Sequence, residues 1–259
     1  MIDLTVPEIR RKLQEADAAA FAVLERSLVA DTRKGVRAAV EVARRRLEAE
    51  AAEEARLAGM YAFERELAAE RGGSVVIGLD EVGRGPLAGP LAVGGVVLDA
   101  DDPIAGLNDS KQVTPKRRDA LYDTIRTVAV AWAVARVEAE EIDATDILSA
   151  RIKSMQMAID RLEPAPGFAL IDGNRDHGKT AAILLEHQTV VKGDSLSASI
   201  AAASILAKVS RDRYMEQMAE RYPEYEFERH KGYGTKRHYE LLRRYGPCPI
   251  HRRTFLKKL

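Results

Sequence analysis

Residues 74–86 read SVVIGLDEVGRGP. The apolar start of this stretch predicts a buried strand, and two adjacent carboxylates, Asp80 and Glu81, follow close to its end. Neighbouring carboxylates repel one another and are costly to desolvate unless a cation lies between them. Oxygen ligands without Cys or His nearby favour a hard ion such as Mg²⁺ or Mn²⁺. Gly83 and Gly85 lack a Cβ and would let the backbone approach a ligand, so the stretch indicates phosphodiester chemistry.

The same stretch has a plainer interpretation. An Asp-Glu pair at the end of a strand is also typical of a solvated turn, and a Gly-x-Gly pattern alone is a weak signal. The residues of this stretch leave both interpretations open, so the remainder of the chain has to decide between them.

Composition permits one large domain, or a domain with an appendage. The chain has 259 residues, of which 46% are hydrophobic, and its 40 Lys and Arg balance its 40 Asp and Glu. The charge is unevenly spread, because residues 229–259 contain ten Lys or Arg and a single acid, Glu240. A basic end on a neutral protein suits local phosphate contact. It also suits a solvated tail that only aids solubility.

The chain shows no sign of secretion or of a membrane span. Cys248 is its only cysteine, which excludes an intrachain disulfide and fits a reducing compartment. The N-terminus lacks a basic segment followed by an apolar run, and no stretch of about 18 apolar residues occurs. We therefore expect a cytoplasmic protein with no membrane partner.

Residues 1–72 differ from the rest in composition and predict a helical N-terminal extension. Ala, Glu, Arg and Leu dominate, acids alternate with bases, and Gly72-Gly73 marks the boundary. We expect helical pieces that start after Thr5, run over 31–47, and cover 61–70. The extension is either a small helical hairpin that packs or dimerises, or a nucleic-acid accessory module, which its balanced charge does not favour.

Residues 73–259 alternate strands with helices and predict an α/β layer fold around one main sheet. The expected strands are 75–79, 91–98, 128–137, 168–172 and one ending at 189–191. The expected helices are 115–126, 145–162, a long one rich in small residues over 196–221, and a basic one over 236–245.

Two further carboxylates lie where a ligand would bind. Phe168–Asp172 is a second apolar strand that ends in a carboxylate followed by glycine, and ligands of open α/β sheets gather beyond strand ends. Asp172 therefore either lies beside Asp80 or belongs to an Asp-Gly turn without a ligand. Asp194 and Ser195 precede the long helix, where either is a natural N-cap, and Asp194 is alternatively a fourth carboxylate of the metal site.

Other motifs offer contacts to nucleic acid. Tyr233 lies between glycines in a basic setting, which suits stacking on a sugar or base, although a tyrosine closing the edge of the core is also common. Residues 108–111 offer short donors and one cation for phosphate, or form an ordinary polar turn. Arg211 and Asp212 are interpreted as a surface pair or as support for the site. No histidine has metal-ligand spacing to another.

Together these motifs resemble bacterial ribonuclease HII. The matching stretches, in order, are GLDEVGRGPLAGP at 78–90, LNDSK at 107–111, IDGN at 171–174, KGDSLSASIAAASILAKVSRDR at 192–213, HKGYGTKRH at 230–238 and PIHRRTF at 249–255. The segments Leu4-Thr5-Val6 and 61–67 are similar, more weakly, to a helical extension that some members carry. The resemblance implies an RNase H-like fold with a mixed five-stranded sheet flanked by helices.

The resemblance also implies an activity and a site. The activity is cleavage of RNA in RNA–DNA hybrids and 5′ of single ribonucleotides in duplex DNA, leaving a 3′-hydroxyl and a 5′-phosphate, with no required protein partner evident. The cofactor is a two-metal site of Mg²⁺ or Mn²⁺. Catalysis and metal binding fall to Asp80, Glu81, Asp172 and Asp194. Nucleic-acid binding falls to Gly83, Arg84, Gly85, Asn108, Ser110, Lys111, Lys192 and Tyr233.

Rival functions remain. A different two-metal nuclease, acting for example on DNA junctions, would share the carboxylates and need no reader of the ribose 2′-OH. A non-catalytic hybrid-binding protein would not need the complete acidic set. The related type III enzyme is closer, but the Gly-Arg-Gly loop and Tyr233 favour type II. Glu81 also sets a structural condition, because adjacent strand residues point to opposite faces unless the chain turns just after Asp80.

Overall fold

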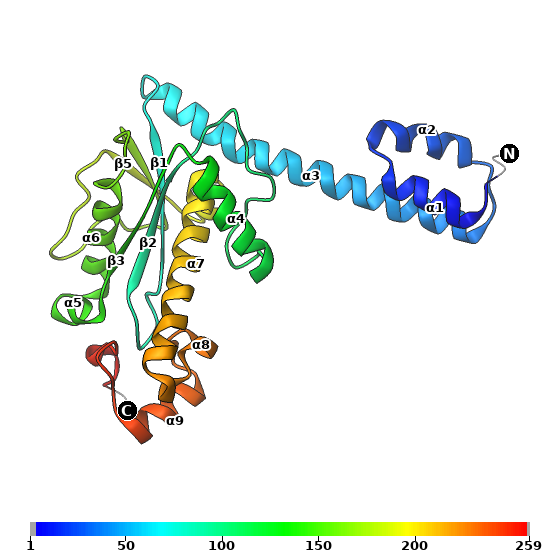
Figure 1. Cartoon of the computed structure of the whole chain (residues 1–259). Coiled ribbons are helices and arrows are strands. Elements are labelled where there is room, and N and C mark those ends of the chain that lie inside the picture. The colour runs from blue at the N-terminus through cyan, green and yellow to red at the C-terminus, as the bar shows by residue number, and fades with distance from the viewer. Residues whose placement is uncertain (1–3, 258–259) are drawn as a thin grey trace. The chain divides into compact units, whose positions relative to one another are not determined.

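The computed structural model describes residues 4–257. It divides into two compact units, Met1–Ala58 and Gly59–Leu259 (Figure 1). The helices and strands are α1 (Val6–Glu15), α2 (Ala18–Leu28), α3 (Lys34–Glu70), β1 (Val76–Val82), β2 (Leu91–Val97), α4 (Pro115–Val128), β3 (Ala131–Val137), α5 (Ala139–Ala144), α6 (Ile147–Ile159), β4 (Phe168–Asp172), β5 (His187–Val190), α7 (Ala198–Arg221), α8 (Phe227–His230) and α9 (Lys236–Tyr245). Short 3₁₀ turns cover Gly193–Ser195, Pro223–Tyr225 and Arg253–Phe255.

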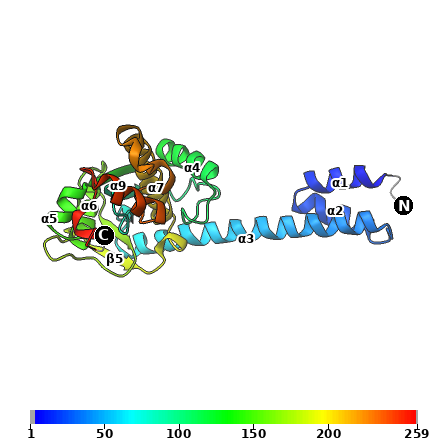
Figure 2. The ribbon, with the colours of Figure 1, turned by 90° about the horizontal axis from the view of Figure 1, so that it is seen from below.

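The first unit is a small helical cluster. Helices α1 and α2 lie along the first part of α3 in both views (Figures 1 and 2), and they bury a shared core that includes Leu13, Phe21 and Val36. The predicted pieces at 31–47 and 61–70 are wrong as separate helices, because α3 is continuous from Lys34 to Glu70. No proline interrupts that range, and each of its two glycines, Gly35 and Gly59, costs only about 1 kcal/mol.

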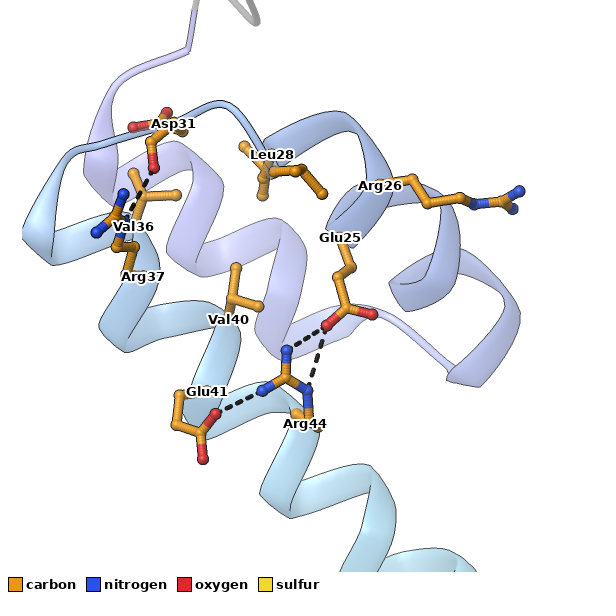
Figure 3. Close-up of a pocket in the computed structure, with 10 residues that line it drawn as sticks. Glu25, Arg26, Leu28, Asp31, Val36, Arg37, Val40, Glu41 and Arg44 are labelled. Atoms are coloured by element: carbon orange, nitrogen blue, oxygen red, sulfur yellow. Dashed lines mark hydrogen bonds and ion pairs between the residues drawn. The ribbon is translucent and has the colours of Figure 1, made fainter.

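A pocket of about 520 Å³ lies in this first unit, between α2 and α3 (Figure 3). Three of its charged side chains are paired with one another. The Arg44 guanidinium donates to Glu25 and, at 2.6 Å, to Glu41. The lining contains three carboxylates and three guanidinium groups, so the pocket has no net positive charge of the kind that holds a phosphate.

The second unit is built on a mixed five-stranded sheet with the order β3-β2-β1-β4-β5, which confirms the predicted fold. β1 pairs antiparallel with β2 and parallel with β4, and β5 extends the parallel side. Helix α6 covers one face, where Ile77, Leu79 and Met155 join a buried cluster. Helix α7 covers the opposite face (Figure 1).

Helix α7 packs unusually close to the sheet. A Cβ added to Gly78 of β1 would lie 2.2 Å from the carbonyl carbon of Ser199, and one added to Gly94 of β2 would lie 2.2 Å from the carbonyl oxygen of Ala203. Backbone therefore meets backbone along this seam. The small residues predicted for the long helix make this approach possible.

The start of α7 differs from the prediction. The helix begins at Ala198, and its N-cap is Ser197, whose Oγ accepts from the backbone N–H of Ile200. The predicted caps, Asp194 and Ser195, lie instead in the preceding 3₁₀ turn. Glu64 adds a buried carboxylate at this end, where it accepts from the backbone N–H of Ser199 at 2.7 Å. A carboxylate at a helix N-terminus is favourable because it meets unpaired N–H groups and the positive end of the dipole.

Other boundaries are corrected in smaller ways. The predicted helix 145–162 is α6, with the separate short helix α5 before it, and the predicted strand 128–137 begins at Ala131 because α4 continues to Val128. Arg211 is fully buried, so its interpretation as half of a surface pair is wrong. Asp212 pairs with Lys208 instead.

Within residues 4–257, no helix is both long and apolar enough to cross a membrane.

Candidate functional site

The register of the parallel strands brings Asp80 and Asp172 together. β1 and β4 pair up to Leu79 opposite Ile171, and the next residue on each strand is the aspartate. Equivalent positions on parallel neighbours point to the same face of the sheet, here the face covered by α7. The backbone N–H of Gly193 then donates to Asp172 Oδ1 at 2.7 Å, which ties the turn that carries Asp194 to the end of β4.

Burial and mutual repulsion raise the pKa values of these carboxyl groups. Desolvation, followed by the charges of Glu81 and Asp172, raises the pKa of the buried Asp80 well above its ordinary value. Burial and then the charge of Asp172 also raise the pKa of Asp194. The structure therefore gathers mutually repelling carboxylates at this edge of the sheet.

Lys111 faces this acidic group. Desolvation by itself would lower the pKa of its ammonium, but the charges of Asp109, Asp80, Asp194 and Asp172 raise it instead. Its side chain is largely exposed, so it stays protonated and accessible to a substrate phosphate. Asp109 belongs to the same group through its effect on Lys111 and Asp194, although the sequence motif gave it no role.

Glu81 does not lie on the same face as Asp80. β1 continues to Val82, so the turn required after Asp80 is absent, and alternation sends Glu81 toward α6. There its Oε2 lies 2.9 Å from Nε of Arg151, and both side chains are nearly buried. The charge of Glu81 still reaches Asp80, because it is the second cause of the raised pKa.

Arg151 is a site residue that sequence reasoning missed. Besides meeting Glu81, its Nη2 donates to the carbonyl oxygen of Asp172 at 2.7 Å, so one guanidinium links the ends of β1 and β4. A signal was present in the sequence. Arg151 occupies the same helical stripe as Met155 and Ile159, which face the core, and a charge in an apolar stripe needs a partner.

The donor set fits a hard divalent cation by its chemistry. It consists of carboxylates only, and the raised pKa of Asp80 marks a place where a cation would relieve repulsion. As the side chains stand, no three His, Cys, Asp or Glu of residues 4–257 surround one point closely enough to hold an ion. The arrangement is thus an acidic cluster rather than a closed coordination shell.

The Gly-Arg-Gly turn follows β1 directly. Gly83 has φ of 95°, and a Cβ there would lie 2.4 Å from Nε of the buried Arg211. Arg84 and Gly85 are exposed, and Arg84 Nη1 lies 3.5 Å from Glu81 Oε1. A small polar pocket of about 90 Å³ lies beside this turn. Its lining includes Arg84, Arg151 and Arg175, and also Glu81 and Asp172.

The remaining predicted contacts are spread around this cluster. Ser110 is buried and its Oγ accepts from Ser204 Oγ, while Asn108 Oδ1 accepts from the N–H of Asp109. Lys192 is exposed with a left-handed backbone, immediately before the turn that carries Asp194. Ser110 therefore supports α7 rather than facing a ligand.

Tyr233 belongs to a loop that is joined to the Gly-Arg-Gly turn. Tyr233 is 41% exposed as a residue, which does not suit a tyrosine closing the core edge. The N–H of Leu87 donates to the carbonyl of Gly232 at 2.8 Å, and the N–H of Arg252 donates to the carbonyl of Leu87 at 2.8 Å. The stretch after Gly85 is thus held between the Tyr233 loop and the C-terminal segment.

A chain of neutral histidines supports the Tyr233 loop. The N–H of Cys248 donates to Nδ1 of His251, so the proton of that ring is on Nε2, which lies 3.0 Å from Nε2 of His238. His238 then donates from Nδ1 to the carbonyl of Tyr233 at 2.9 Å. Burial first, and the neighbouring histidines next, lower the pKa of His251 to about 4, and burial lowers that of His238 to about 4.

We expect acid to destabilise the fold through this pair. A histidine whose folded pKa lies below its unfolded value of 6.5 favours folding above that value and loses the contribution as the pH falls toward about 4. The loss amounts to about 3 kcal/mol for one imidazole. Thermal melts between about pH 7 and pH 4.5 should show a falling Tm that flattens in His251→Gln.

The exposed His177 supplies the control for that measurement. His177→Asn should keep the wild-type pH dependence, because the ring lies at the surface. Asp80, with its raised pKa, acts in the opposite direction and is common to all variants. The same slope in His251→Gln as in the wild type would contradict the role of the buried pair.

Comparison with known proteins identifies the family. The family model for ribonuclease HII matches residues 77–258, and the model for the ribonuclease HII N-terminal domain matches residues 5–68. Ribonuclease HII of Halalkalibacterium halodurans is 44% identical over 252 residues, covering 97% of this chain and 94% of the relative. Ribonuclease HII of Listeria monocytogenes is 42% identical over 251 residues, with coverage of 97% and 94%.

Solved structures agree with the sequence comparisons. The crystal structure of ribonuclease H2 from Pyrococcus horikoshii superposes with a TM-score of 0.58 at 30% identity, covering 69% of this chain and 92% of that one. The family model that matches residues 77–258 and both relatives cover the carboxylate cluster and the loops around it. The chain therefore belongs to the ribonuclease HII family, a family of metal-dependent nucleases.

Proposed function

We propose that the protein hydrolyses the RNA strand of RNA–DNA hybrids and cuts 5′ of single ribonucleotides embedded in duplex DNA. The observation that carries the proposal is the juxtaposition of Asp80 and Asp172 at the ends of parallel strands, with the exposed cation Lys111 facing them. An acidic cluster repels a phosphodiester unless cations offset it, which agrees with a metal-dependent hydrolase and disfavours a simple hybrid-binding protein.

The residues that would hold Mg²⁺ or Mn²⁺ are Asp80, Asp172 and Asp194, together with Glu81, which reaches the cluster from the α6 side through the small pocket that it lines with Asp172. The chemistry supplied by such ions is activation of a water and stabilisation of the leaving 3′ oxygen. Arg151 fixes the carboxylate of Glu81 and the end of β4 relative to each other. Lys111 binds a substrate phosphate, and its protonated state is maintained by the surrounding carboxylates.

The loops around the cluster recognise the nucleic acid. The exposed backbone at Arg84 and Gly85 approaches the ribose and reads its 2′-OH, the group that distinguishes RNA from DNA locally. Tyr233 presents an exposed ring for stacking on the neighbouring sugar or base. Asn108 and Lys192 contact phosphates at the edge of the site.

One incubation separates this function from its rivals. A DNA duplex that carries one ribonucleotide should be cut on the 5′ side of that residue in the presence of Mg²⁺, leaving a 3′-hydroxyl and a 5′-phosphate. An otherwise identical all-DNA duplex should stay intact, and chelation of the metal should stop the reaction. Cleavage of both duplexes would indicate a general two-metal nuclease, and binding without cleavage would indicate a hybrid-binding protein.

The role of the Gly-Arg-Gly loop in recognising the ribose can be tested with a pair of glycine variants. In Gly85→Ala, the added Cβ meets no protein atom within 4 Å, so folding should persist while the methyl group obstructs the sugar. We expect kcat/KM on the one-ribonucleotide duplex to fall about tenfold or more, with a change in unfolding free energy of less than about 0.5 kcal/mol.

Gly83→Ala is the matched comparison. Here the Cβ would press on Arg211 and the backbone has a positive φ, so stability should fall by about 1–3 kcal/mol. Denaturant unfolding and initial rates measured on the same preparations distinguish the two variants. Wild-type cleavage by Gly85→Ala would remove this loop from substrate recognition.

A further inference from the structure

The C-terminal stretch PIHRRTF contains a buried arginine that the proposed mechanism does not use. Arg252 is fully buried, and its guanidinium donates only to backbone carbonyls. Nη2 lies 2.7 Å from the carbonyl oxygen of Gly83 and 2.8 Å from that of Gly89, and Nη1 lies 3.2 Å from that of Arg84. All three acceptors belong to the loop that follows β1.

A second buried arginine completes the arrangement. Arg211 of α7 donates to the carbonyl oxygens of Pro90 at 2.9 Å, Ala88 at 3.1 Å and Lys231 at 3.0 Å. Neither Arg211 nor Arg252 has a carboxylate within ion-pair distance among the residues that the structure describes. Two cations therefore converge on one loop, where backbone carbonyls accept their hydrogen bonds and the rings of Tyr233 and Phe255 lie nearby.

Such an arrangement is costly, which argues against packing as its only purpose. Burial, and then the charge of Arg211, lower the pKa of Arg252 to about 9, so the side chain is still protonated at neutral pH. Even a buried ion pair can often be replaced by well-packed apolar side chains at no loss of stability, so a buried charge without a counterion is not needed for packing. What a planar guanidinium provides, and an apolar side chain does not, is a fixed orientation of several carbonyl groups at once.

The orientation of those carbonyls determines where the loop's N–H groups point. In a planar trans peptide, the C=O and the following N–H point in opposite directions. Because the carbonyls of Gly83 and Arg84 turn inward to Arg252, the N–H groups of Arg84 and Gly85 turn outward at exposed positions. Neither N–H has a hydrogen-bond partner within residues 4–257.

We propose that Arg252 is a positioning residue for ribonucleotide recognition: by holding the carbonyls of Gly83 and Arg84 inward, it presents the N–H groups of Arg84 and Gly85 to the ribose-phosphate of the substrate. The proposal rests on the proposed function. It extends that function to a residue 169 positions away in the chain from Gly83. A substitution that keeps the charge but lacks the planar guanidinium should no longer hold these carbonyls inward. The N–H groups of Arg84 and Gly85 would then be free to rotate away from the substrate.

The test uses two variants of Arg252 and two controls in the full chain. Arg252→Lys keeps the charge without the planar fork, and Arg252→Gln loses both. Arg253→Gln changes the neighbouring arginine, whose side chain is exposed. Leu162→Ala removes a buried side chain from the cluster beneath α6 and supplies a destabilised protein with an intact loop.

Each protein is assayed below its melting temperature in two ways. One is kcat/KM on the one-ribonucleotide duplex with Mg²⁺, and the other is Kd for an all-DNA duplex in chelator, which reports general phosphate attraction. We expect Arg252→Lys to lower kcat/KM about tenfold or more with Kd within about twofold of wild type, and Arg252→Gln to lower kcat/KM further. Both controls should retain the wild-type kcat/KM.

Three outcomes would contradict the positioning role of Arg252. Wild-type kcat/KM in Arg252→Lys overturns the role, as does an equal loss in Leu162→Ala, which would trace the effect to stability. A loss of kcat/KM matched by an equal loss of all-DNA affinity would make Arg252 a source of general attraction instead. The proposed function fails separately, if the wild-type protein does not cut at the ribonucleotide.

Discussion

Asp80→Asn should lower kcat about a thousandfold or more, equivalent to about 4 kcal/mol of transition-state stabilisation, while raising the melting temperature of the metal-free protein. The two effects have one cause. The buried carboxylate has a raised pKa because of desolvation and then the charges of Glu81 and Asp172, so its ionised form destabilises the fold. An amide of the same shape removes that repulsion and also removes a charged ligand for the metal.

The experiment combines single-turnover rates with melts in the presence and absence of Mg²⁺. Mg²⁺ should raise the Tm of the wild type, because a ligand that binds only the folded state stabilises it, and it should raise that of Asp80→Asn less. Asp123→Asn, at an exposed position on α4, is the control and should match the wild type. Unchanged turnover by Asp80→Asn in saturating Mg²⁺ would exclude Asp80 from the metal site.

Gly78→Ala should strongly destabilise the protein. Its Cβ would lie 2.2 Å from one backbone atom of α7 and 2.3 Å from the next, so no side chain can move to make room. Either α7 separates from β1 or the strand bends. We expect a loss of about 3 kcal/mol or more, seen as a large fall in Tm or as insoluble protein.

Gly94→Ala should behave in the same way, since its Cβ would meet the carbonyl oxygen of Ala203. Gly85→Ala is the matched control, because the same methyl group is added where no protein atom lies within 4 Å. Urea unfolding of the three variants would give the comparison. If Gly78→Ala lowers the free energy of unfolding by less than about 1 kcal/mol, α7 can move away from the sheet at little cost.

The fold was largely readable from the sequence, because each strand has its own local signal. Apolar runs that end in Asp or Gly predicted β1 and β4, and the second half of the chain alternates strands with helices as an α/β fold requires. The residues at which helices and strands begin and end were harder to predict from the sequence. The cap of α7 moved to Ser197 because a 3₁₀ turn, stabilised by Asp172 and Gly193, uses the residues that looked like caps.

The candidate site divides in the same way. Asp80, Glu81 and Asp172 follow from motifs, and motif order also indicated Asp194, Lys111 and Tyr233. Arg151 did not follow from any motif, because its importance depends on reaching Glu81 and Asp172 from another element. Arg211 was misjudged for the same reason: local sequence paired it with Asp212, whereas its acceptors are carbonyls far along the chain.

By itself the sequence determined that carboxylates stand at the ends of apolar strands, since that depends on residue type and spacing along a short segment. Only the tertiary structure decided that Asp80 and Glu81 face different helices, and that buried arginines orient the loop beyond them. Those outcomes depend on burial and on partners from distant elements. Hydrogen-bond direction and desolvation exist only once the chain has folded.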